Sequence, residues 1–373
     1  MRILHLVSVW DGGVRGQVLA VSQRLAAQGH TVRVLALRCK ASAEDDPSVA
    51  VIELLRQKSL MELLRAVFRA RREIRAFAPD VVHGHSFHAI LLARLLRLVA
   101  PIPYLVSTFH TSAGARNTLD GGPRYTIPYR LTDPLGDIST NVCREAAESF
   151  VRAGAVPRRR IVTVYDGIDT AKFAPNPAPR AAERQQLALR ADQFLWLAVG
   201  RLCQAKDYPT LLRAFAQLAS QSPSSVLAIA GDGPLEAGLR AYAVSLDLGP
   251  RVRFLGRCED VPRLLQAADA YVLSSAWEGF PNGLAEAMST ALPVVSTACC
   301  GADELLGTDA APVPVGDAAA LAARMLDVER MTPTARRDLG FLSRQRVVER
   351  FSLEHCCQSW LALYASRIRR AGA

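Results

Sequence analysis

Residues 3–37, ILHLVSVWDGGVRGQVLAVSQRLAAQGHTVRVLAL, decide the fold class. An apolar run, a pair of glycines, a segment of helical periodicity, a Gly-His stop and a second apolar run follow one another at positions 3–7, 12–13, 18–27, 29–30 and 31–37. This order predicts a strand, a tight loop, a helix and a second strand, which form a β-α-β unit. Further predicted strands at 79–83 and 104–108, with a helix over 89–99 between them, make the first half a doubly wound α/β domain.

The same pattern restarts at residue 194. Apolar runs predict strands at 194–199, 226–230, 252–255, 270–274 and 293–296, and helical periodicity predicts helices over 210–219 and 235–246. A chain of 373 residues also exceeds the length at which one hydrophobic core stops growing. The sequence therefore predicts two Rossmann-like domains facing across a cleft, with ligands at the carboxyl ends of the strands.

The domain boundaries follow from composition. Residues 174–180, APNPAPR, are rich in proline and have the composition of a linker. We expect one domain over 1–170 and a second over 171–352. A helix from about 353 to 373 is expected to pack back on the first domain.

Composition excludes several classes of protein. Hydrophobic residues make up 50% of the chain and charged residues 21%, which is typical of a globular protein and not of a disordered one. The N-terminal apolar run is short and has no small-residue cleavage site, so we expect a strand there, not a signal peptide. The most apolar later stretch, 89–100, contains Arg94 and Arg97 and is too short to span a bilayer. We therefore expect a cytoplasmic protein without a transmembrane helix.

The eight cysteines do not form a metal or disulfide pattern. None are spaced as Cys-x-x-Cys, and 299–300 and 356–357 are adjacent doublets among apolar residues. We expect reduced, mostly buried thiols and no zinc site.

One segment has half of the chain's net charge of +10. Residues 56–75 contain seven basic and two acidic residues, and apolar side chains recur at helical spacing at Leu60, Leu64, Val67, Phe68 and Ile74. The segment is predicted to be an amphipathic helix with a basic outer face. That face is either simply solvated or attracted to an anionic membrane surface or a lipid-linked diphosphate. No nucleic-acid recognition motif accompanies the charge, so nucleic acid is not expected as a partner.

The richest motif follows the predicted strand 270–274. Residues 275–288 read SAWEGFPNGLAEAM, with glutamates at 278 and 286. Asn282 is predicted to be the N-cap of a helix whose Gly283 and Leu284 offer free backbone N–H groups to a diphosphate. Two other interpretations are a capped helix with a surface glutamate and a glycosidase-like carboxylate pair, which requires a separation of roughly 5–10 Å.

This motif resembles the Glu-x7-Glu signature of the family 4 retaining glycosyltransferases, the GT-B enzymes also called glycosyl transferases group 1. The resemblance implies that Glu278 contacts hydroxyls of the donor sugar and that Glu286 holds the ribose hydroxyls. It also places Phe280, Asn282, Gly283 and Leu284 in the substrate site. By the same resemblance, the first domain is the acceptor side and the second binds a nucleotide-sugar.

A second match lies directly after the predicted strand 194–199. In VGRLCQAKD, residues 199–207, the resemblance implies that Arg201 and Lys206 bind the donor diphosphate. Such a cation pair would stabilise the charge that develops on the leaving group. The alternative is a pair of exposed charges in a loop.

Weaker matches extend the resemblance over most of the chain. Residues 230–234, AGDGP, with Gly231, and 254–256, FLG, are placed like the loops that line the nucleoside pocket. Gly12 and Gly13 resemble the glycine loop that approaches the donor phosphates, although the dinucleotide fingerprint Gly-x-Gly-x-x-Gly is absent. His110 matches a histidine beside the donor sugar, with a core histidine as the alternative.

Three other features complete the comparison with the family. His83, His85 and His88 have metal-like spacing, but their strand and turn are ordinary for this family, and no metal is expected. Residues 165–169, YDGID, have Asp166 where the family usually has asparagine. Residues 116–133 fit no regular element and are the candidate acceptor loop.

The resemblance implies a retaining hexosyltransferase that needs neither metal nor cofactor. The donor is expected to be a nucleotide-sugar, a UDP-hexose or UDP-N-acetylhexosamine before GDP-mannose, because of the Phe-Pro-Asn form of the motif. The acceptor is expected to be a glycan or a lipid-linked sugar in surface polysaccharide or glycolipid assembly, at the inner face of the membrane, with a soluble acceptor as the alternative. His110 and Glu278 would orient the sugar during catalysis. Two rivals remain: a nucleotide-sugar epimerase or hydrolase on the same fold, and a non-catalytic sugar-nucleotide-binding protein.

Overall fold

The chain was analysed as a computed structural model that describes residues 1–39, 50–53, 60–112, 123–307 and 310–371. It divides into two compact units. Unit 1 comprises Met1–Gly167 and Leu353–Ala373, and unit 2 comprises Ile168–Ser352.

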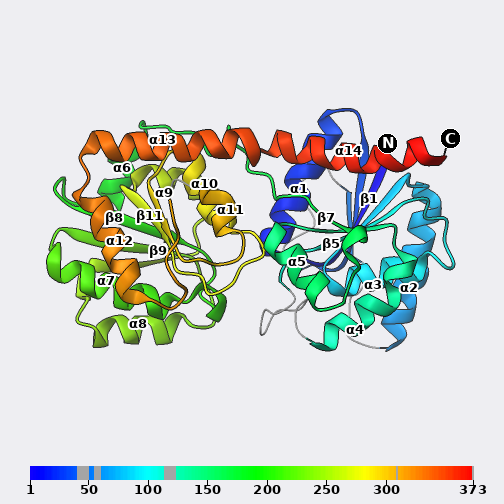
Figure 1. The fold of residues 1–373 in the computed structure, drawn as a ribbon, viewed down its shortest axis with the longest axis horizontal. Coiled ribbons are helices and arrows are strands. Elements are labelled where there is room, and N and C mark those ends of the chain that lie inside the picture. Colours follow the sequence, from blue (N-terminus) through cyan, green and yellow to red (C-terminus); the bar gives the residue numbers. More distant parts are fainter. Residues whose placement is uncertain (40–49, 54–59, 113–122, 308–309, 372–373) are drawn as a thin grey trace. The chain divides into compact units, whose positions relative to one another are not determined.

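Unit 1 is built on a seven-stranded parallel sheet, whose strands lie in the order β3-β2-β1-β4-β5-β6-β7 (Figure 1). The strands are β1 (Arg2–Trp10), β2 (Thr31–Cys39), β3 (Ala50–Glu53), β4 (Val81–His85), β5 (Leu105–Phe109), β6 (Ile138–Asn141) and β7 (Ile161–Thr163). The helices are α1 (Gly12–Ala27), α2 (Leu60–Phe77), α3 (Phe87–Leu96), α4 (Pro123–Thr132), α5 (Arg144–Arg152) and α14 (Leu353–Ala371).

Alternate residues of the central strands face different helices, because side chains of a strand point to opposite faces of the sheet. Leu4, Leu6 and Val82 pack in one core with residues of α2 and α3. Ile3 and Val81 pack on the other face, with residues of α1 and α14. Both faces are covered, which is why these strands are almost continuously apolar.

Unit 2 repeats this architecture with a five-stranded parallel sheet in the order β10-β9-β8-β11-β12. The strands are β8 (Phe194–Val199), β9 (Ser225–Ala230), β10 (Val252–Gly256), β11 (Ala270–Leu273) and β12 (Val294–Ser296). The helices are α6 (Arg180–Gln186), α7 (Tyr208–Gln221), α8 (Glu236–Ser245), α9 (Val261–Ala267), α10 (Asn282–Ser289), α11 (Ala302–Leu306), α12 (Ala318–Arg330) and α13 (Pro333–Arg350). Two Rossmann-like units with parallel sheets confirm the predicted fold class.

Several details differ from the predictions. Gly12 and Gly13 are not a loop, because α1 begins at Gly12 and Asp11 caps it by accepting a hydrogen bond from the Gly12 N–H. Part of the candidate acceptor loop is helical, since α4 covers 123–132, and residues 116–122 lie outside the described residues. The proline-rich run is not a linker: Asn176 N–H donates to Gln266 Oε1 over 2.8 Å, which ties the run to unit 2.

The basic segment is helical and the thiols are free as expected, but Leu64 and Phe68, which were predicted for the apolar face of the helix, are 49% and 66% exposed. The helix α2 begins at Leu60, and residues 56–59 lie outside the described part of the chain. Five of the eight cysteines are buried and all eight are free thiols, while Cys39, Cys203 and Cys258 are partly exposed. None of the described helices is both long and apolar enough to cross a bilayer.

Candidate active site

In unit 2, loops from the carboxyl ends of β8, β9 and β10 are held together by backbone hydrogen bonds. Leu202 N–H donates to Asp232 O over 2.7 Å, and Gly231 N–H donates to Gly256 O over 2.7 Å. At Gly231, where φ is +142°, a Cβ atom would lie 2.0 Å from Gly200 O. The loop at 230–234 therefore requires glycine there, because no side chain fits between the two strand ends.

Lys206 and Glu278 form a partly buried ion pair at these strand ends. Lys206 Nζ lies 2.5 Å from Glu278 Oε1, and the same carboxylate oxygen accepts a hydrogen bond of 2.6 Å from Ser275 Oγ. Burial lowers the pKa of Lys206, but attraction to Glu278 outweighs burial and the net pKa is raised. The ammonium therefore remains charged, and an incoming anion would compete with Glu278 for it.

The local sequence explains how Lys206 is positioned. Residues Gln204–Lys206 form one 3-10 turn, which ends at Asp207 with φ +43° and ψ +47°. Asp207 then caps α7 by accepting from Thr210 N–H. The adjoining loop is fixed by Ser274 Oγ, which donates to Lys206 O over 2.7 Å. The lysine thus projects from a turn that is anchored on both sides.

Glu286 lies on α10 and has the most strongly shifted pKa of the carboxyls in this site. Burial raises its pKa to about 7, although the positive charges of Lys172 and Lys206 act in the opposite direction. A carboxylate that is partly desolvated gains from ligands that donate hydrogen bonds to it. Lys172 was not singled out from the sequence; it lies far from both motifs in the chain.

The start of α10 differs from the expected one. Asn282 is the first helical residue, and Pro281 takes the N-cap position without a side-chain hydrogen bond, so the prediction of Asn282 as N-cap is wrong. The Leu284 N–H is not free either, because it donates to Pro281 O over 3.0 Å. Gly283 N–H has no hydrogen-bond partner in the described part of the chain. A Cβ at Gly283 would lie 2.7 Å from Tyr271 Oη, so only glycine fits without a shift.

Three other predicted residues of unit 2 lie as follows. Phe280 is 5% exposed and its ring lies 5.8 Å from that of Phe351, so its side chain belongs to the core and leaves only its backbone for a ligand. The side chain of Leu284 is fully buried. Arg201 is exposed, and it has no ion pair among the described residues.

In unit 1, Gly12 and Gly13 are exposed in the first turn of α1, and a Cβ at either would meet nothing within 4 Å. Only the positive φ of Gly12, +59°, favours glycine at that position. Packing therefore leaves the backbone of this turn open to a ligand.

His110 directly follows β5, is partly buried, and belongs to a group of four histidines. Its Nε2 lies 3.1 Å from Nδ1 of His85, and Nε2 of His85 lies 2.9 Å from Nδ1 of His5. Burial lowers the pKa of His110 and of His5 to about 4, so both rings are neutral at pH 7. His88, which shares the metal-like spacing of His83 and His85 in the sequence, is exposed on α3 and is not part of the group.

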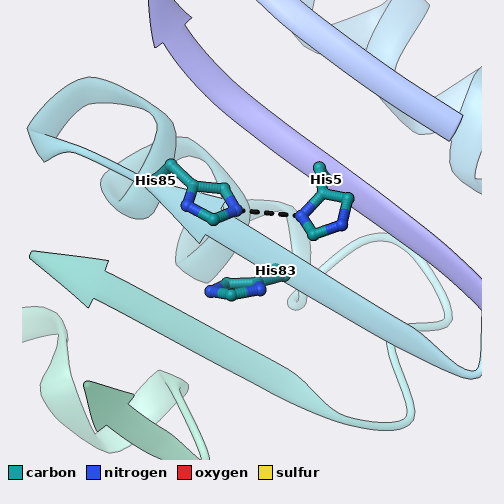
Figure 2. A group of neighbouring side chains, drawn as sticks. All are labelled: His5, His83 and His85. Carbon is teal, nitrogen blue, oxygen red and sulfur yellow. Dashed lines mark hydrogen bonds between the residues drawn. The ribbon is translucent and has the colours of Figure 1, made fainter. Parts of the chain in front are cut away.

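His5 was missed in the sequence because it stands within an apolar strand. Its signal was a histidine at the centre of the apolar run ILHLV, 80 residues before its partner His85. Ring nitrogens of His5, His83 and His85 lie within 4.8 Å of one another (Figure 2), the one such cluster of metal-ligand side chains among the described residues.

The geometry of this cluster disfavours a metal. The rings of His83 and His85 are 4.0 Å apart with an interplanar angle of 33°, so their in-plane lone pairs do not converge on one point. Both nitrogens of His83 are also occupied, by Tyr364 Oη and Thr108 Oγ1. The expectation that the protein uses no metal stays a prediction.

Comparison with known proteins supplies the family. A model of Glycosyltransferase Family 4 matches residues 11–172, and a model of Glycosyl transferases group 1 matches residues 179–341. The chain is 29% identical over 251 residues to an Escherichia coli protein named UDP-Gal:alpha-D-GlcNAc-diphosphoundecaprenol alpha-1,3-galactosyltransferase. That match covers 65% of this chain and 64% of the relative, slightly less than two thirds of its length.

Two further similarities cover more of the chain. A D-inositol 3-phosphate glycosyltransferase of Geodermatophilus obscurus is 29% identical over 381 residues, covering 91% of this chain and 83% of the relative. The crystal structure of Anabaena HepE in complex with UDP and glucose superposes with a TM-score of 0.82 at 20% identity, covering 98% of this chain and all of HepE. The matched segments, 11–172 and 179–341, account for most of both units, and the chain belongs to the family 4 glycosyltransferases with the GT-B fold.

Proposed function

We propose that this chain is a retaining glycosyltransferase that moves a hexose or N-acetylhexosamine from a UDP-sugar to an acceptor hydroxyl. The observation that carries the proposal is the cluster at the strand ends of unit 2. There a charged lysine is paired with Glu278 and lies near a second, partly desolvated carboxylate, Glu286. A nucleoside diphosphate-sugar has the matching groups: phosphate oxygens for Lys206, sugar hydroxyls for Glu278 and ribose hydroxyls for Glu286.

The proposed reaction is a front-face substitution. The bond between the anomeric carbon and the β-phosphate oxygen breaks, and the acceptor oxygen forms a new bond on the same face. The acceptor proton passes to a phosphate oxygen of the departing diphosphate, so no enzymic base is required. Lys206, Arg201 and the free Gly283 N–H would stabilise the charge of the leaving group, which is where a preorganised positive site lowers the barrier most.

Pairing with Glu278 gives Lys206 a second function in this proposal. Without donor, the ammonium neutralises a carboxylate that would otherwise be desolvated and unpaired. When the diphosphate binds, Lys206 contacts both anions, and Glu278 remains hydrogen-bonded to Ser275 while it accepts from the sugar. His110 keeps the role that the family resemblance implies, a contact to the donor sugar.

The named ligands of two similar proteins favour the UDP-sugar over GDP-mannose. One is a galactosyltransferase named for UDP-Gal, and the other was solved with UDP and glucose. The first also has a diphosphoundecaprenol-linked acceptor in its name, which favours a lipid-linked acceptor in polysaccharide or glycolipid assembly. The inositol-phosphate enzyme keeps a soluble acceptor as the second candidate.

A lipid-linked acceptor agrees with the surface of α2. Met61, Leu64 and Phe68 are 58%, 49% and 66% exposed on this helix, and basic side chains stand beside them. The Arg72 side chain is 78% exposed, whereas the acidic residues of the helix, Glu62 and Glu73, are largely buried. Exposed apolar and cationic groups on one helix bind anionic bilayers, so we propose peripheral attachment at the cytoplasmic face of the membrane.

The test is a binding and transfer assay on the full chain. A thermal-shift screen with UDP, GDP and ADP and their common sugars, with and without EDTA, should show stabilisation by UDP compounds that EDTA does not remove. Incubation of the best donor with lipid-linked and soluble sugars should then give a product with retained anomeric configuration. Free or epimerised sugar without acceptor product would identify a hydrolase or epimerase. Binding without any turnover would identify a sugar-nucleotide-binding protein.

A further inference from the structure

The buried histidines of unit 1 form a directional hydrogen-bonded chain. His5 lies on β1 and His85 ends β4, while His110 follows β5, so three neighbouring strands contribute one ring each. In the register of β1 and β4, His5 lies opposite His83 and Val7 opposite His85. The side chains therefore project to the same face of the sheet, the face covered by α1 and α14.

The contacts form one line of rings, shown in part in Figure 2. His5 Nδ1 contacts His85 Nε2 over 2.9 Å, and His85 Nδ1 contacts His110 Nε2 over 3.1 Å. At one end, His5 Nε2 is buried and has no hydrogen-bond partner among the described residues. At the other end, Nδ1 of the partly exposed His110 also has none, and it is the atom through which the line can reach a ligand. His83 stands beside this line, with both of its nitrogens bonded to hydroxyl groups.

Counting protons limits the line to two arrangements. Burial holds the pKa of each ring below its ordinary value, so each ring carries a single N–H at neutral pH. Each contact between two rings needs one N–H and one lone pair. Either every N–H points toward His110, which then presents Nδ1–H, or every N–H points toward His5, and His110 presents a bare Nδ1 lone pair.

The buried end selects the first arrangement. If the protons pointed toward His5, its Nε2–H would be a buried donor without an acceptor. Orphaned buried N–H groups are rarer in native proteins than under-satisfied acceptors, because the desolvated donor has no compensation. With the protons pointing toward His110, only a lone pair is left unpaired at His5 Nε2.

We propose that His5 and His85 are positioning residues that hold His110 as its Nδ1–H tautomer, so that His110 presents a hydrogen-bond donor and not a base. The inference rests on the proposed function only where it assigns a substrate oxygen to that donor. In that role His110 can donate to an oxygen of the donor sugar, and it cannot accept the proton of the acceptor hydroxyl. This leaves the phosphate oxygen as the proton acceptor, as the front-face reaction requires.

The test observes the tautomer directly. In the full chain labelled with ¹⁵N-histidine, the imidazole nitrogen shifts and two-bond couplings distinguish Nδ1–H from Nε2–H, and His110→Asn identifies the His110 signals. We expect His110 to be the neutral Nδ1–H form in the wild type. An Nε2–H form, or a stoichiometric metal whose removal by EDTA shifts the His5 and His85 signals, would overturn the proposal.

Two substitutions at His5 provide the matched pair. In His5→Asn the side-chain amide can donate to His85 Nε2 from the place of Nδ1, so the line keeps its direction and kcat stays within about twofold of the wild type. In His5→Asp the carboxylate can only accept, so His85 must present Nε2–H to it and accept at Nδ1, and His110 should change to Nε2–H with a loss of about tenfold in kcat, the effect of one hydrogen bond. The spectra are recorded at a pH at which His85 is neutral, and an unchanged His110 tautomer there would contradict the proposal.

The two readouts also separate this inference from the proposed function. If His110 changes tautomer in His5→Asp while kcat stays the same, the positioning is supported and the proposed contact of His110 with the donor fails. If no transfer is found with any donor, the tautomer measurement still decides on the positioning.

Discussion

Both units place polar side chains beside the central strands of a parallel sheet, but the two groups differ in charge. In unit 1 four imidazoles are neutral, because burial lowers the pKa of each and no carboxylate pairs with them among the described residues. In unit 2 a lysine and two glutamates lie together, and Lys206 is paired with Glu278. Neutral imidazoles can set the direction of a hydrogen-bonded line through the positions of their protons. Charged side chains can instead exchange a partner in the protein for a charged group of a ligand.

The difference shows how one fold can serve two tasks. A buried ion pair contributes little to stability, since desolvation of both ions offsets their attraction. The presence of the Lys206–Glu278 ion pair in unit 2 is therefore better explained by the binding of an anionic, hydroxyl-rich donor than by a contribution to folding stability. The four predictions below test this contrast, beginning with the largest effect.

Removing the charge of Lys206 should have the largest effect. Lys206→Ala deletes the proposed diphosphate contact and leaves Glu278 desolvated beside Ser275. We expect kcat/KM for transfer to fall by about 100- to 1000-fold, as for the loss of one group that stabilises a developing anion. Steady-state kinetics with a saturating acceptor measures this effect.

Arg240→Ala is the control, because Arg240 is a half-exposed cation that pairs with Glu236 on the surface of α8. Its kinetics should stay within about twofold of the wild type, since exposed pairs of this kind contribute little. Equal losses in both variants would mean that net charge matters and that Lys206 has no specific role.

The raised pKa of Glu286 predicts a pH-dependent stability. Burial raises the folded-state pKa to about 7 from its ordinary 4.5, so the folded protein holds the proton more tightly than the unfolded chain. Stability should therefore fall as the pH rises from about 4.5 to about 7, and this loss persists at higher pH. In Glu286→Gln the loss is absent, and the variant should be more stable than the wild type at pH 8 by up to ~3 kcal/mol.

Urea denaturation of both proteins at pH 5 and pH 8 gives the comparison. Glu286→Gln and the wild type should differ less at pH 5, where Glu286 is protonated in the folded state. If the free energies of unfolding of the two proteins differ by the same amount at both pH values, the substitution does not act through the buried carboxyl.

Gly283→Ala tests the close approach at the start of α10. The new Cβ would lie 2.7 Å from Tyr271 Oη, so we expect a destabilisation of about 1–3 kcal/mol from overpacking. Tyr271→Phe removes the obstructing oxygen, together with its 3.3 Å hydrogen bond to Val199 O. The double variant should therefore lose less stability than the sum of the two single variants, and strict additivity would refute the clash.

The smallest effect is expected at the surface of α2. Phe68→Ser and Arg72→Ser should each weaken binding to vesicles that contain anionic lipid by about fivefold, which is roughly 1 kcal/mol per group. Phe341→Ser is the matched control, because Phe341 is 64% exposed on α13 of unit 2. Sedimentation with anionic and neutral vesicles measures the binding, and equal effects at Phe68 and Phe341 would contradict a specific membrane face.

The sequence was sufficient for the central strands of both sheets and for the motifs, because apolar runs and glycine positions are local signals. The strand Phe194–Val199 was predicted to the residue. Of the two glutamates of the motif, Glu278 pairs with Lys206 and Glu286 interacts with it electrostatically. The short strands β3, β6 and β7 were missed, since three or four residues give little periodicity. The equally short β11 and β12 were predicted from their runs of apolar residues.

Contacts between distant strands could not be read from the sequence. His5 and His85 are 80 residues apart and meet only because β1 and β4 pair in the sheet. The wrong N-cap at Asn282 has a local cause: Pro281 fixes the backbone one residue earlier, and the helix starts there without a side-chain cap.

The central claim is that unit 2 binds a nucleoside diphosphate through Lys206 and Glu286. Isothermal titration of UDP, in EDTA, into the wild type, Lys206→Ala and Glu286→Ala tests it most directly. We predict saturable one-to-one binding by the wild type and a loss of at least about tenfold in affinity in each variant, which is 1.4 kcal/mol or more. Wild-type binding that neither substitution weakens, or no binding of UDP, GDP or ADP at all, would contradict the account.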